Sequence, residues 1–517
     1  MITKTKNNCD IILISGEYWD DHPLSPVGVI ARVLDNKGYK VGIIERPEKD
    51  RDFTRLGRPK LFFGISSGSV DSMVHNYTPM KRSRKDDPYS NIFSLPDRAV
   101  IVYCNAIKRL MKGVPIVIGG IESSLRRFAH YDYWDNKIRR SILLDSRADI
   151  LVYGNGEKQV LEIASRLKGG KDLMGIEGTC VLSREIDESF HVLPSFSDVM
   201  GNPDKFCEMQ AAFSINRNLA QEYNNNYILQ FAYPQYTSDD LDRIYGLNYS
   251  RKMHQHSLLK GMKYSVVTHR GCIGTCSFCS ISMHQGRRLI SRSEKSILKE
   301  IGSLNSIRGF RGYVDDLGGP SANMYGMDCA ECSEGECIGC ERLERDHKRL
   351  ISLMKEAREI PGIKNIFVRS GIRYDLAVDS PEYVKELVAH HISGTLKVAP
   401  EHFSQEVLQL MGKCNDRFED FINMYNAQSR GLKQALRLYL MIGHPGETMD
   451  TISYLTRRIR KMKNIENFQF FTPTPMTVST CMYWTNMHPE TKEKVNVVHD
   501  YYTKKRMKRK ILSVIGH

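Results

Sequence analysis

The chain has 517 residues, of which 41% are hydrophobic and 26% charged, a composition typical of a globular rather than a disordered protein. No apolar run is long enough to cross a bilayer, and the apolar segment near the N-terminus is too short for a signal peptide, so we expect a cytoplasmic protein with no membrane partner. The formal net charge of +14 does not by itself indicate a nucleic-acid-binding protein.

The first part of the chain, residues 1–175, alternates short apolar strands with amphipathic helices, a rhythm typical of an open parallel sheet. The expected strands are 11–14, 41–44, 61–65, 116–118 and 150–153, and the expected helices are 27–36 and 99–111. Glycines follow some of these strands, at the edge where ligands bind in such sheets. The sequence therefore predicts an α/β domain of the doubly wound type.

The pattern loosens over residues 176–255, which we interpret as a linker with some helix. A second alternating region covers 256–485 and predicts a partial β/α barrel with a cysteine-rich insertion at 321–346. Its expected strands are 265–268, 312–315, 366–368, 395–398, 436–441 and 468–471. Active sites of such barrels lie at the carboxyl ends of the strands.

A basic segment, residues 486–517, ends the chain. Its cations are Lys504, Lys505, Arg506, Lys508, Arg509 and Lys510, with no acidic neighbour from Tyr501 onward. Such a run is either the solvated face of a helix or a contact with phosphates.

Thirteen cysteines, an odd number, favour thiols and metal ligands over a disulfide framework. Three of them, Cys272, Cys276 and Cys279, form a C-x3-C-x2-C loop directly after a predicted strand. Three thiolates leave one iron of a 4Fe-4S cluster without a protein ligand, whereas a structural zinc site needs a fourth ligand from elsewhere. The spacing therefore favours an open iron-sulfur cluster.

This loop, with Phe278 before its last cysteine, resembles the signature of the radical S-adenosylmethionine (SAM) superfamily. In that superfamily a reduced cluster cleaves SAM to methionine and a 5'-deoxyadenosyl radical. The resemblance implies further cofactor-binding residues after the later strands: Gly318 and Gly319 for the SAM amino group, Glu401 for the ribose, and Gly443 and Glu447 along the adenine. Glu447 is equally suited to cap the helix that follows.

Longer strings resemble one branch, the YgiQ-type radical SAM proteins, over nearly the whole chain. They cover residues 119–134, 368–375, 397–402 and 471–480. This resemblance implies the fold and the cofactor but no reaction on a substrate.

A second cysteine group lies in the insertion: Cys329, Cys332, Cys337 and Cys340 form two C-x2-C pairs. Four thiolates suit a zinc ion or a second 4Fe-4S cluster, and we favour the cluster slightly. Its role is open between electron relay, substrate ligand and structural staple.

The first domain resembles the cobalamin-binding domain found in many radical SAM proteins. Cobalt ligation there needs D-x-H-x-x-G, and this chain has Asp20-Asp-His22-Pro-Leu-Ser25 instead, so we do not expect cobalamin. A polar and aromatic group comprising Arg126, Arg127, His130, Tyr131, Asp132, Tyr133 and Trp134 follows Gly119–Gly120 and is either a pocket lining or an interdomain contact.

The function expected from the sequence is a radical SAM enzyme that takes its electron from a flavodoxin or ferredoxin and acts on an unknown substrate. Two alternatives are an RNA-modifying radical SAM enzyme and a two-cluster electron-transfer protein without SAM chemistry. The glycine-rich elements at 318–319 and 443–447 argue against the latter, because an electron carrier does not need a SAM pocket.

Overall fold

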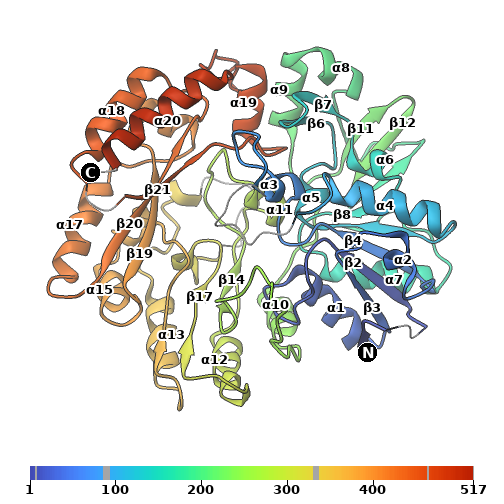
Figure 1. The fold of residues 1–517 in the computed structure, drawn as a ribbon, viewed down its shortest axis with the longest axis horizontal. Helices are drawn as coiled ribbons and strands as arrows, with labels where there is room; N and C mark the ends of the chain where they lie inside the picture. Colours follow the sequence, from blue (N-terminus) through green and yellow to red (C-terminus); the bar gives the residue numbers. More distant parts are fainter. Residues whose placement is uncertain (6–7, 85–93, 330–336, 463–464, 516–517) are drawn as a thin grey trace. The chain divides into compact units, whose positions relative to one another are not determined.

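The computed structural model describes residues 1–5, 8–84, 94–329, 337–462 and 465–515, and the chain forms two compact units (Figure 1). Unit 1 contains residues 1–235, 247–260 and 472–493, and unit 2 contains residues 236–246, 261–471 and 494–517. The domain boundaries expected from the sequence, at 175, 255 and 485, differ from the limits of these two units. In the described part of the chain, no helix is both long enough and apolar enough to cross a membrane.

Unit 1 is built on a ten-stranded sheet with the order β1-β3-β2-β4-β5-β8-β9-β12-β11-β10. The strands β1 to β5 and β8 pair in parallel, as predicted for a doubly wound domain. They are β1 (Ile2–Thr3), β2 (Ile11–Ser15), β3 (Val41–Glu45), β4 (Phe62–Ser66), β5 (Ile116–Ile118) and β8 (Ile150–Val152). All side chains of β2 are buried, because helices cover both faces of a parallel sheet.

Helices connect these strands. They are α1 (Pro26–Asn36), α2 (Asp50–Thr54), α3 (Ser72–Asn76), α4 (Ala99–Leu110), α5 (Gly120–Ser124), α6 (Ile142–Ser146) and α7 (Glu157–Lys168), with the hairpin of β6 (His130–Asp132) and β7 (Lys137–Arg139) between α5 and α6. Ser25 caps α1 by accepting a hydrogen bond from the Gly28 N–H, and Pro26 occupies the first turn, so the helix begins one residue before the predicted start. Helices α1 and α7 pack on each other.

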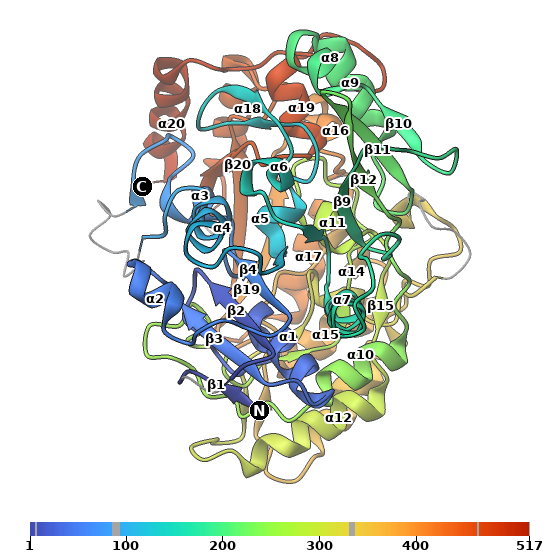
Figure 2. The ribbon, with the colours of Figure 1, turned by 90° about the vertical axis from the view of Figure 1, so that its right-hand side faces the viewer.

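The segment expected as a linker, 176–255, instead completes the sheet (Figure 2). It contributes β9 (Thr179–Ser183), β10 (His191–Leu193), β11 (Leu219–Tyr223) and β12 (Asn226–Gln230), followed by α10 (Ser238–Tyr245) of unit 2. Strands β11 and β12 form a hairpin whose two turn residues, Asn224 and Asn225, have φ of 49° and 61°. Two asparagines with positive φ are typical of a tight hairpin turn, so the polar stretch is a turn and not a linker.

Two helices, α8 (Phe196–Gly201) and α9 (Pro203–Ala212), precede this hairpin. Helix α19 (Val478–Thr485) packs on α9, which places residues 472–493 in unit 1 although the sequence suggested the end of the barrel.

Unit 2 contains the six predicted strand regions, in chain order and in parallel. They are β13 (Val266–Val267), β16 (Tyr313–Val314) with β17 (Leu317–Gly318), β18 (Asn365–Ile366), β19 (Thr395–Glu401), β20 (Ala435–Ile442) and β21 (Ile465–Phe470). Parallel pairs join β13 to β17, β16 to β18, and β19 through β20 to β21. A parallel bridge between Ile372 and Val398 continues the row from the β18 region to β19. This is the predicted partial barrel.

The short antiparallel pair of β14 (His269–Arg270) and β15 (Ile290–Ser291) follows the first strand. Besides α10, the helices described in unit 2 are α11 (Ile281–Gln285), α12 (Glu294–Ser303), α13 (Lys348–Arg358), α14 (Tyr374–Ala377), α15 (Pro381–His390), α16 (Gln405–Leu410), α17 (Phe418–Gln428), α18 (Met449–Ile459) and α20 (Tyr501–Ile515), with short 3-10 turns at Leu304–Ser306, Ala322–Met324 and Cys337–Gly339. Helix α20 lies beside α18 (Figure 1) and buries Met507 and Ile511 there.

Candidate cofactor site

The predicted cysteine loop follows β13 and β14, at the carboxyl end of the first barrel strand. The Cys279 N–H donates to the Cys276 carbonyl at 3.1 Å, which closes a turn between these two ligands. Ser277 ties the loop to the end of α16, because its N–H donates to the Met411 carbonyl at 3.0 Å and its Oγ to the Leu410 carbonyl at 2.6 Å. The loop is therefore held by hydrogen bonds directly after Cys276.

A glycine makes this close approach feasible. Gly412 has φ of 63°, and a Cβ at this position would lie 2.5 Å from the Thr275 carbonyl oxygen. Only glycine combines this backbone conformation with this contact.

Two cations lie near the thiols. The Arg373 guanidinium, anchored by Asp375, has Nη1 at 3.7 Å from the Sγ of Cys276. Burial raises the pKa of Cys272, while the Gly274 N–H and the charges of Arg373 and Lys413 act in the opposite direction. Burial also raises the pKa of Cys279 to about 11. Arg373 and Lys413 thus supply positive charge where thiolates are needed.

These three half-buried thiols on one loop fit an iron-sulfur cluster. Cys276 acts to raise the pKa of Cys272, and both act to raise the pKa of Cys279, as expected for thiols close together on one loop. Within the described residues, no three Cys, His, Asp or Glu side chains surround a single-ion position. A 4Fe-4S cluster is larger than one ion and binds each thiolate through a different iron.

The glycine pair after β17 lies against a histidine. A Cβ on Gly319 would lie 2.6 Å from Cε1 and Nε2 of His269, and one on Gly318 would lie 3.2 Å from the Ala322 Cβ. His269 is fully buried; burial lowers its pKa to about 4, and a backbone hydrogen bond with Ser321 acts in the opposite direction. The two glycines leave the backbone here open to a polar ligand, because neither carries a side chain.

Glu401 ends β19 with φ of 65°, an uncommon conformation for a residue other than glycine. Its carboxylate lies 3.7 Å from Nζ of Lys413, which also donates to the Ala399 carbonyl. Burial raises the pKa of Glu401, and Lys413 opposes this effect.

Gly443 and Glu447 lie in the turn after β20. Gly443 has φ of 79°, and its N–H donates to Oε2 of Glu447 at 2.7 Å. The helix α18 is capped by Thr448, whose hydroxyl accepts a hydrogen bond from the Thr451 N–H, so Glu447 does not cap it. Glu447 is fully buried, and burial raises its pKa to about 8.

Phe278 packs against Val407, Leu408 and Met411 of the α16 segment, and its ring centroid lies 6.1 Å from that of His444. It thus joins the cysteine loop to the turn after β20.

The structure therefore places the predicted residues of the barrel at the carboxyl ends of successive strands. Sequence reasoning did not single out His269, His402, Arg373 or Lys413. The signal for Arg373 and His402 was available, because both lie within the family strings at 368–375 and 397–402.

The second cysteine group is described only in part, since Cys332 lies outside the described residues. Cys329, Cys337 and Cys340 are half-buried, and the Cys340 N–H donates to the Cys337 carbonyl at 3.1 Å. Cys337 and Cys272 pack against the same apolar cluster, which includes Ile273 and Met324. Cys272 and Cys337, one from each cysteine group, thus lie near each other in unit 2.

His22 is fully buried in unit 1. The Leu24 N–H donates to its Nδ1 at 3.1 Å, and Nη1 of Arg251 lies 3.1 Å from its Nε2. Both ring nitrogens are therefore occupied by protein groups, and this arrangement does not fit cobalt ligation by His22.

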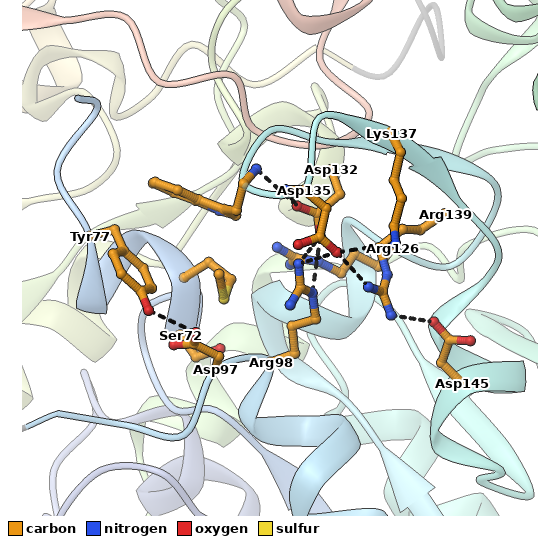
Figure 3. A network of polar contacts seen from close by, with 12 residues as sticks. Ser72, Tyr77, Asp97, Arg98, Arg126, Asp132, Asp135, Lys137, Arg139 and Asp145 are labelled. Carbon is orange, nitrogen blue, oxygen red and sulfur yellow. Dashed lines mark hydrogen bonds and ion pairs between the residues drawn. The ribbon is translucent and has the colours of Figure 1, made fainter. Parts of the chain in front are cut away.

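The polar patch of unit 1 is a network of ion pairs (Figure 3). Arg98 lies 2.8 Å from both Asp132 and Asp135, and Arg139 bridges Asp135 and Asp145 at 2.8 and 3.1 Å. Tyr131 stacks on Trp484 of the same unit at 4.9 Å. Most of the patch is thus internal structure of unit 1.

Comparison with known proteins identifies the class of protein to which the chain belongs. Residues 1–266 match the family described as Radical SAM N-terminal, and residues 266–459 match the radical SAM superfamily. Together with the cysteine loop and the barrel, these matches define a radical SAM protein.

The chain belongs to the UPF0313 family, whose member in Escherichia coli is YgiQ, so the predicted YgiQ-type membership is confirmed. It is 43% identical to a UPF0313 protein of Methanocaldococcus jannaschii, over 96% of this chain and 88% of that protein. It is 42% identical to one of Methanocella arvoryzae, over 95% of this chain and 88% of that protein.

Among solved structures, the chain is similar to the radical SAM methyltransferase TsrM from Kitasatospora setae, solved with cobalamin and a 4Fe-4S cluster bound. The TM-score is 0.57 at 16% identity, over 98% of this chain and 90% of TsrM. A second TsrM structure, with tryptophan substrate and a SAM analogue, gives 0.56. This likeness shows the fold. It does not support the expected absence of cobalamin, because TsrM has that cofactor bound.

Proposed function

We propose that this protein is a radical SAM enzyme whose cluster ligands are Cys272, Cys276 and Cys279. The observation that carries the proposal is the shared position of these thiols, Gly318–Gly319, Glu401 and Gly443–Glu447 at the carboxyl ends of successive parallel strands. When bound, a reduced 4Fe-4S cluster supplies the electron that cleaves SAM into methionine and a 5'-deoxyadenosyl radical.

The residues of the chain bind and orient the cofactors. Arg373 and Lys413 offset the negative charge of the thiolates, and the glycines at 318–319 give a ligand access to the backbone. Glu401 offers a carboxylate for sugar hydroxyls, and the Gly443 turn is held by Glu447. The electron comes from a small carrier such as a flavodoxin or ferredoxin, and the substrate is open.

Anaerobic reconstitution followed by iron and sulfide counting and a reductant-dependent assay for 5'-deoxyadenosine tests this proposal. We expect activity in the wild type, none in Cys276→Ala, and wild-type behaviour in Cys414→Ala, because Cys414 is an exposed thiol of the same unit. A reconstituted protein that cleaves no SAM with any reductant contradicts the proposal and favours an electron-transfer protein.

For Cys329, Cys332, Cys337 and Cys340 we propose a second metal site, favouring a second 4Fe-4S cluster over zinc. Its support is the shared apolar cluster under Cys337 and Cys272. Metal analysis of Cys337→Ala tests this proposal. A loss of about four irons relative to the wild type supports a second cluster, and a loss of zinc shows a zinc site instead. A metal content equal to that of the wild type contradicts any site there.

The likeness to TsrM favours cobalamin as a further cofactor of unit 1. Because both nitrogens of His22 are engaged, we infer that any cobalamin bound here does not use His22 as its cobalt ligand. Equilibrium dialysis with hydroxocobalamin tests this inference: equal binding by wild type and His22→Gln supports it, and binding lost only in the variant overturns it. No binding by the wild type removes cobalamin from the proposal.

An RNA substrate is the second candidate function, and helix α20 favours it. Lys505, Arg506, Lys508 and Arg509 are exposed on this helix and form no ion pair with the described residues. We expect salt-dependent RNA binding that weakens when these four residues are changed to Gln. The matched control changes Lys295 and Lys299, which are exposed on α12. Equal binding by both variants contradicts a role for α20.

A further inference from the structure

Two cysteines of unit 1 that are far apart in the chain lie against each other. Cys207 is on α9 and Cys481 is on α19, 274 residues later, and their Sγ atoms are 3.8 Å apart. Both side chains are fully buried in unit 1, whereas the two cysteine groups described above belong to unit 2. The two thiols therefore form a separate site, outside the proposed cofactor site.

Hydrogen bonds on one face of α9 hold this pair in place. Asp204, Cys207 and Gln210 follow each other at intervals of three residues, so they lie on the same side of the helix. The Asp204 carbonyl accepts a hydrogen bond from Nζ of Lys492 at 3.2 Å. Nε2 of Gln210 donates to the Met476 carbonyl at 3.1 Å. Because these two contacts flank Cys207, they keep the two sulfur atoms facing each other.

The reduced pair is part of a chain of hydrogen bonds. The Cys481 thiol donates to Sγ of Cys207, and the Cys207 thiol donates to Oγ1 of Thr485 at 3.5 Å. The Thr485 hydroxyl in turn donates to the Cys481 carbonyl at 2.8 Å. The hydrogen bond between the thiols is the main cause that lowers the pKa of Cys207, and it raises that of Cys481. Cys207 is therefore the thiol that ionises first, and Cys481 keeps its proton.

Other buried cysteines of unit 1 show the usual state of a core thiol. Cys104 and Cys180 are completely buried, and burial raises the pKa of both, which makes a thiol inert because the thiolate is the nucleophile. Cys207 differs because a second sulfur lies beside it and the exposed Lys492 is near enough to lower its pKa. Thr485, which contacts Cys207, is 8% exposed, so this thiol lies directly beneath the surface.

We propose that Cys207 and Cys481 are a redox-active pair that hydrogen peroxide converts into a disulfide within folded unit 1. The Cys207 thiolate attacks one oxygen of the peroxide, the O–O bond breaks, hydroxide leaves and Cys207 becomes a sulfenic acid. The hydroxide takes the proton of Cys481, whose thiolate attacks the Cys207 sulfur. The S–O bond breaks as the S–S bond forms, and the second hydroxide takes up the proton that Cys207 had lost. Two thiols are thus oxidised, one peroxide is reduced, and two waters leave.

The disulfide fixes α19 on α9. Its formation brings the two sulfurs from 3.8 Å to about 2 Å, a movement on the scale of a side-chain rotation. Residues 472–493 belong to unit 1, while the chain before and after them belongs to unit 2. The bond therefore holds this segment on unit 1, and because it closes a loop of 274 residues it also restricts the unfolded chain. Oxidation should raise the thermal unfolding midpoint Tm, and a thiol reductant should reverse this rise.

Peptide mapping by mass spectrometry tests the proposal on the anaerobically reconstituted full-length protein. After hydrogen peroxide treatment at neutral pH without denaturant, we expect a linked pair of peptides that contain Cys207 and Cys481 and that dithiothreitol separates. Cys481→Ser should give no linked pair but a sulfenic acid at Cys207 that dimedone labels, and Cys104→Ala is the matched control that keeps the link. The treatment should raise Tm of the wild type relative to Cys481→Ser treated in the same way. The linkage is the main readout, because the thiols of the cluster loop also react with peroxide.

Several outcomes overturn the proposal. If peroxide oxidises the exposed Cys414 but produces no link, the pair consists of inert core thiols. A link that forms only in urea, or equally abundant links to Cys104 and Cys180, shows that the unfolded chain reacted. A complete link without any change in Tm relative to Cys481→Ser overturns the role of the bond in holding α19. If Cys481→Ser does not fold, Cys481→Ala replaces it, and the peptide map of the wild type decides whether the disulfide forms.

Discussion

Nε2 of His402 lies 4.0 Å from Oε1 of Glu447, and both side chains are completely buried in unit 2. The Ser404 N–H donates to Nδ1 of His402, so the neutral ring carries its proton on Nε2, the nitrogen nearer the carboxyl group. Among the described residues, neither Nε2 nor Oε1 has a hydrogen-bond partner. Burial lowers the pKa of His402 to about 4 and raises that of Glu447 to about 8.

From this pair we predict that the wild type loses stability as the pH rises from 6.5 to 8. The variant Glu447→Gln should not show this loss. Because the pKa of Glu447 is raised in the folded protein, its contribution to the free energy of unfolding is fully present below pH 4.5. This contribution is lost as the pH rises through about 8. His402, with a lowered pKa, contributes above pH 6.5 and loses this as the pH falls to about 4. Above pH 6.5 only Glu447 of this pair acts, with a slope of at most about 1.4 kcal/mol per pH unit.

Urea unfolding of wild type and Glu447→Gln at pH 6.5 and 8 measures this difference. The wild type should lose more stability over this interval than the variant. Identical changes in both proteins would show that Glu447 keeps an ordinary pKa.

Gly412→Ala should disrupt the cysteine loop. Both Gly412 and Gly431 have positive φ, so alanine strains either position by about 1 kcal/mol. Only at Gly412 does the new Cβ meet backbone, 2.5 Å from the Thr275 carbonyl, whereas nothing lies within 4 Å at Gly431. We expect Gly412→Ala to retain less iron after anaerobic reconstitution and Gly431→Ala to retain the wild-type amount. Equal iron content in the two variants contradicts the role of this contact.

Gly319→Ala should weaken SAM binding. Its Cβ would lie 2.6 Å from the buried ring of His269, whereas a Cβ on Gly371 would only reach 3.8 Å from the Lys397 carbonyl. We expect a loss of roughly tenfold or more in SAM affinity, about 1.4 kcal/mol, for Gly319→Ala and little change for Gly371→Ala. Equilibrium dialysis with SAM on the reconstituted proteins measures it, and similar affinities for both variants would exclude the predicted contact.

Thr448→Ala should destabilise the protein by about 1 kcal/mol, because it removes the side-chain cap of α18. Ser404 precedes α16 in the same position but makes no side-chain cap hydrogen bond, so Ser404→Ala is the matched control. Chemical denaturation of both variants tests this. A larger loss for Ser404→Ala would show that the caps do not decide helix stability here.

The parallel strands of both units could be predicted from the sequence because buried parallel strands consist of continuous apolar runs, as in Ile11–Ser15. It was not readable over 176–255. There the strands β11 and β12 mix polar and apolar residues, and the turn at Asn224–Asn225 shows its nature only through its positive φ values.

The sequence alone determined the cysteine loop, since the spacing of Cys272, Cys276 and Cys279 is local and three thiols within eight residues remain together in any fold. Tertiary structure alone decided which charges surround that loop. Arg373 and Lys413 reach the thiols from segments about a hundred residues or more away, because parallel strands bring their carboxyl ends to one edge. It likewise decided that Arg126 has a carboxylate partner and Arg127 has none, because burial and pairing depend on packing that adjacent sequence positions do not share.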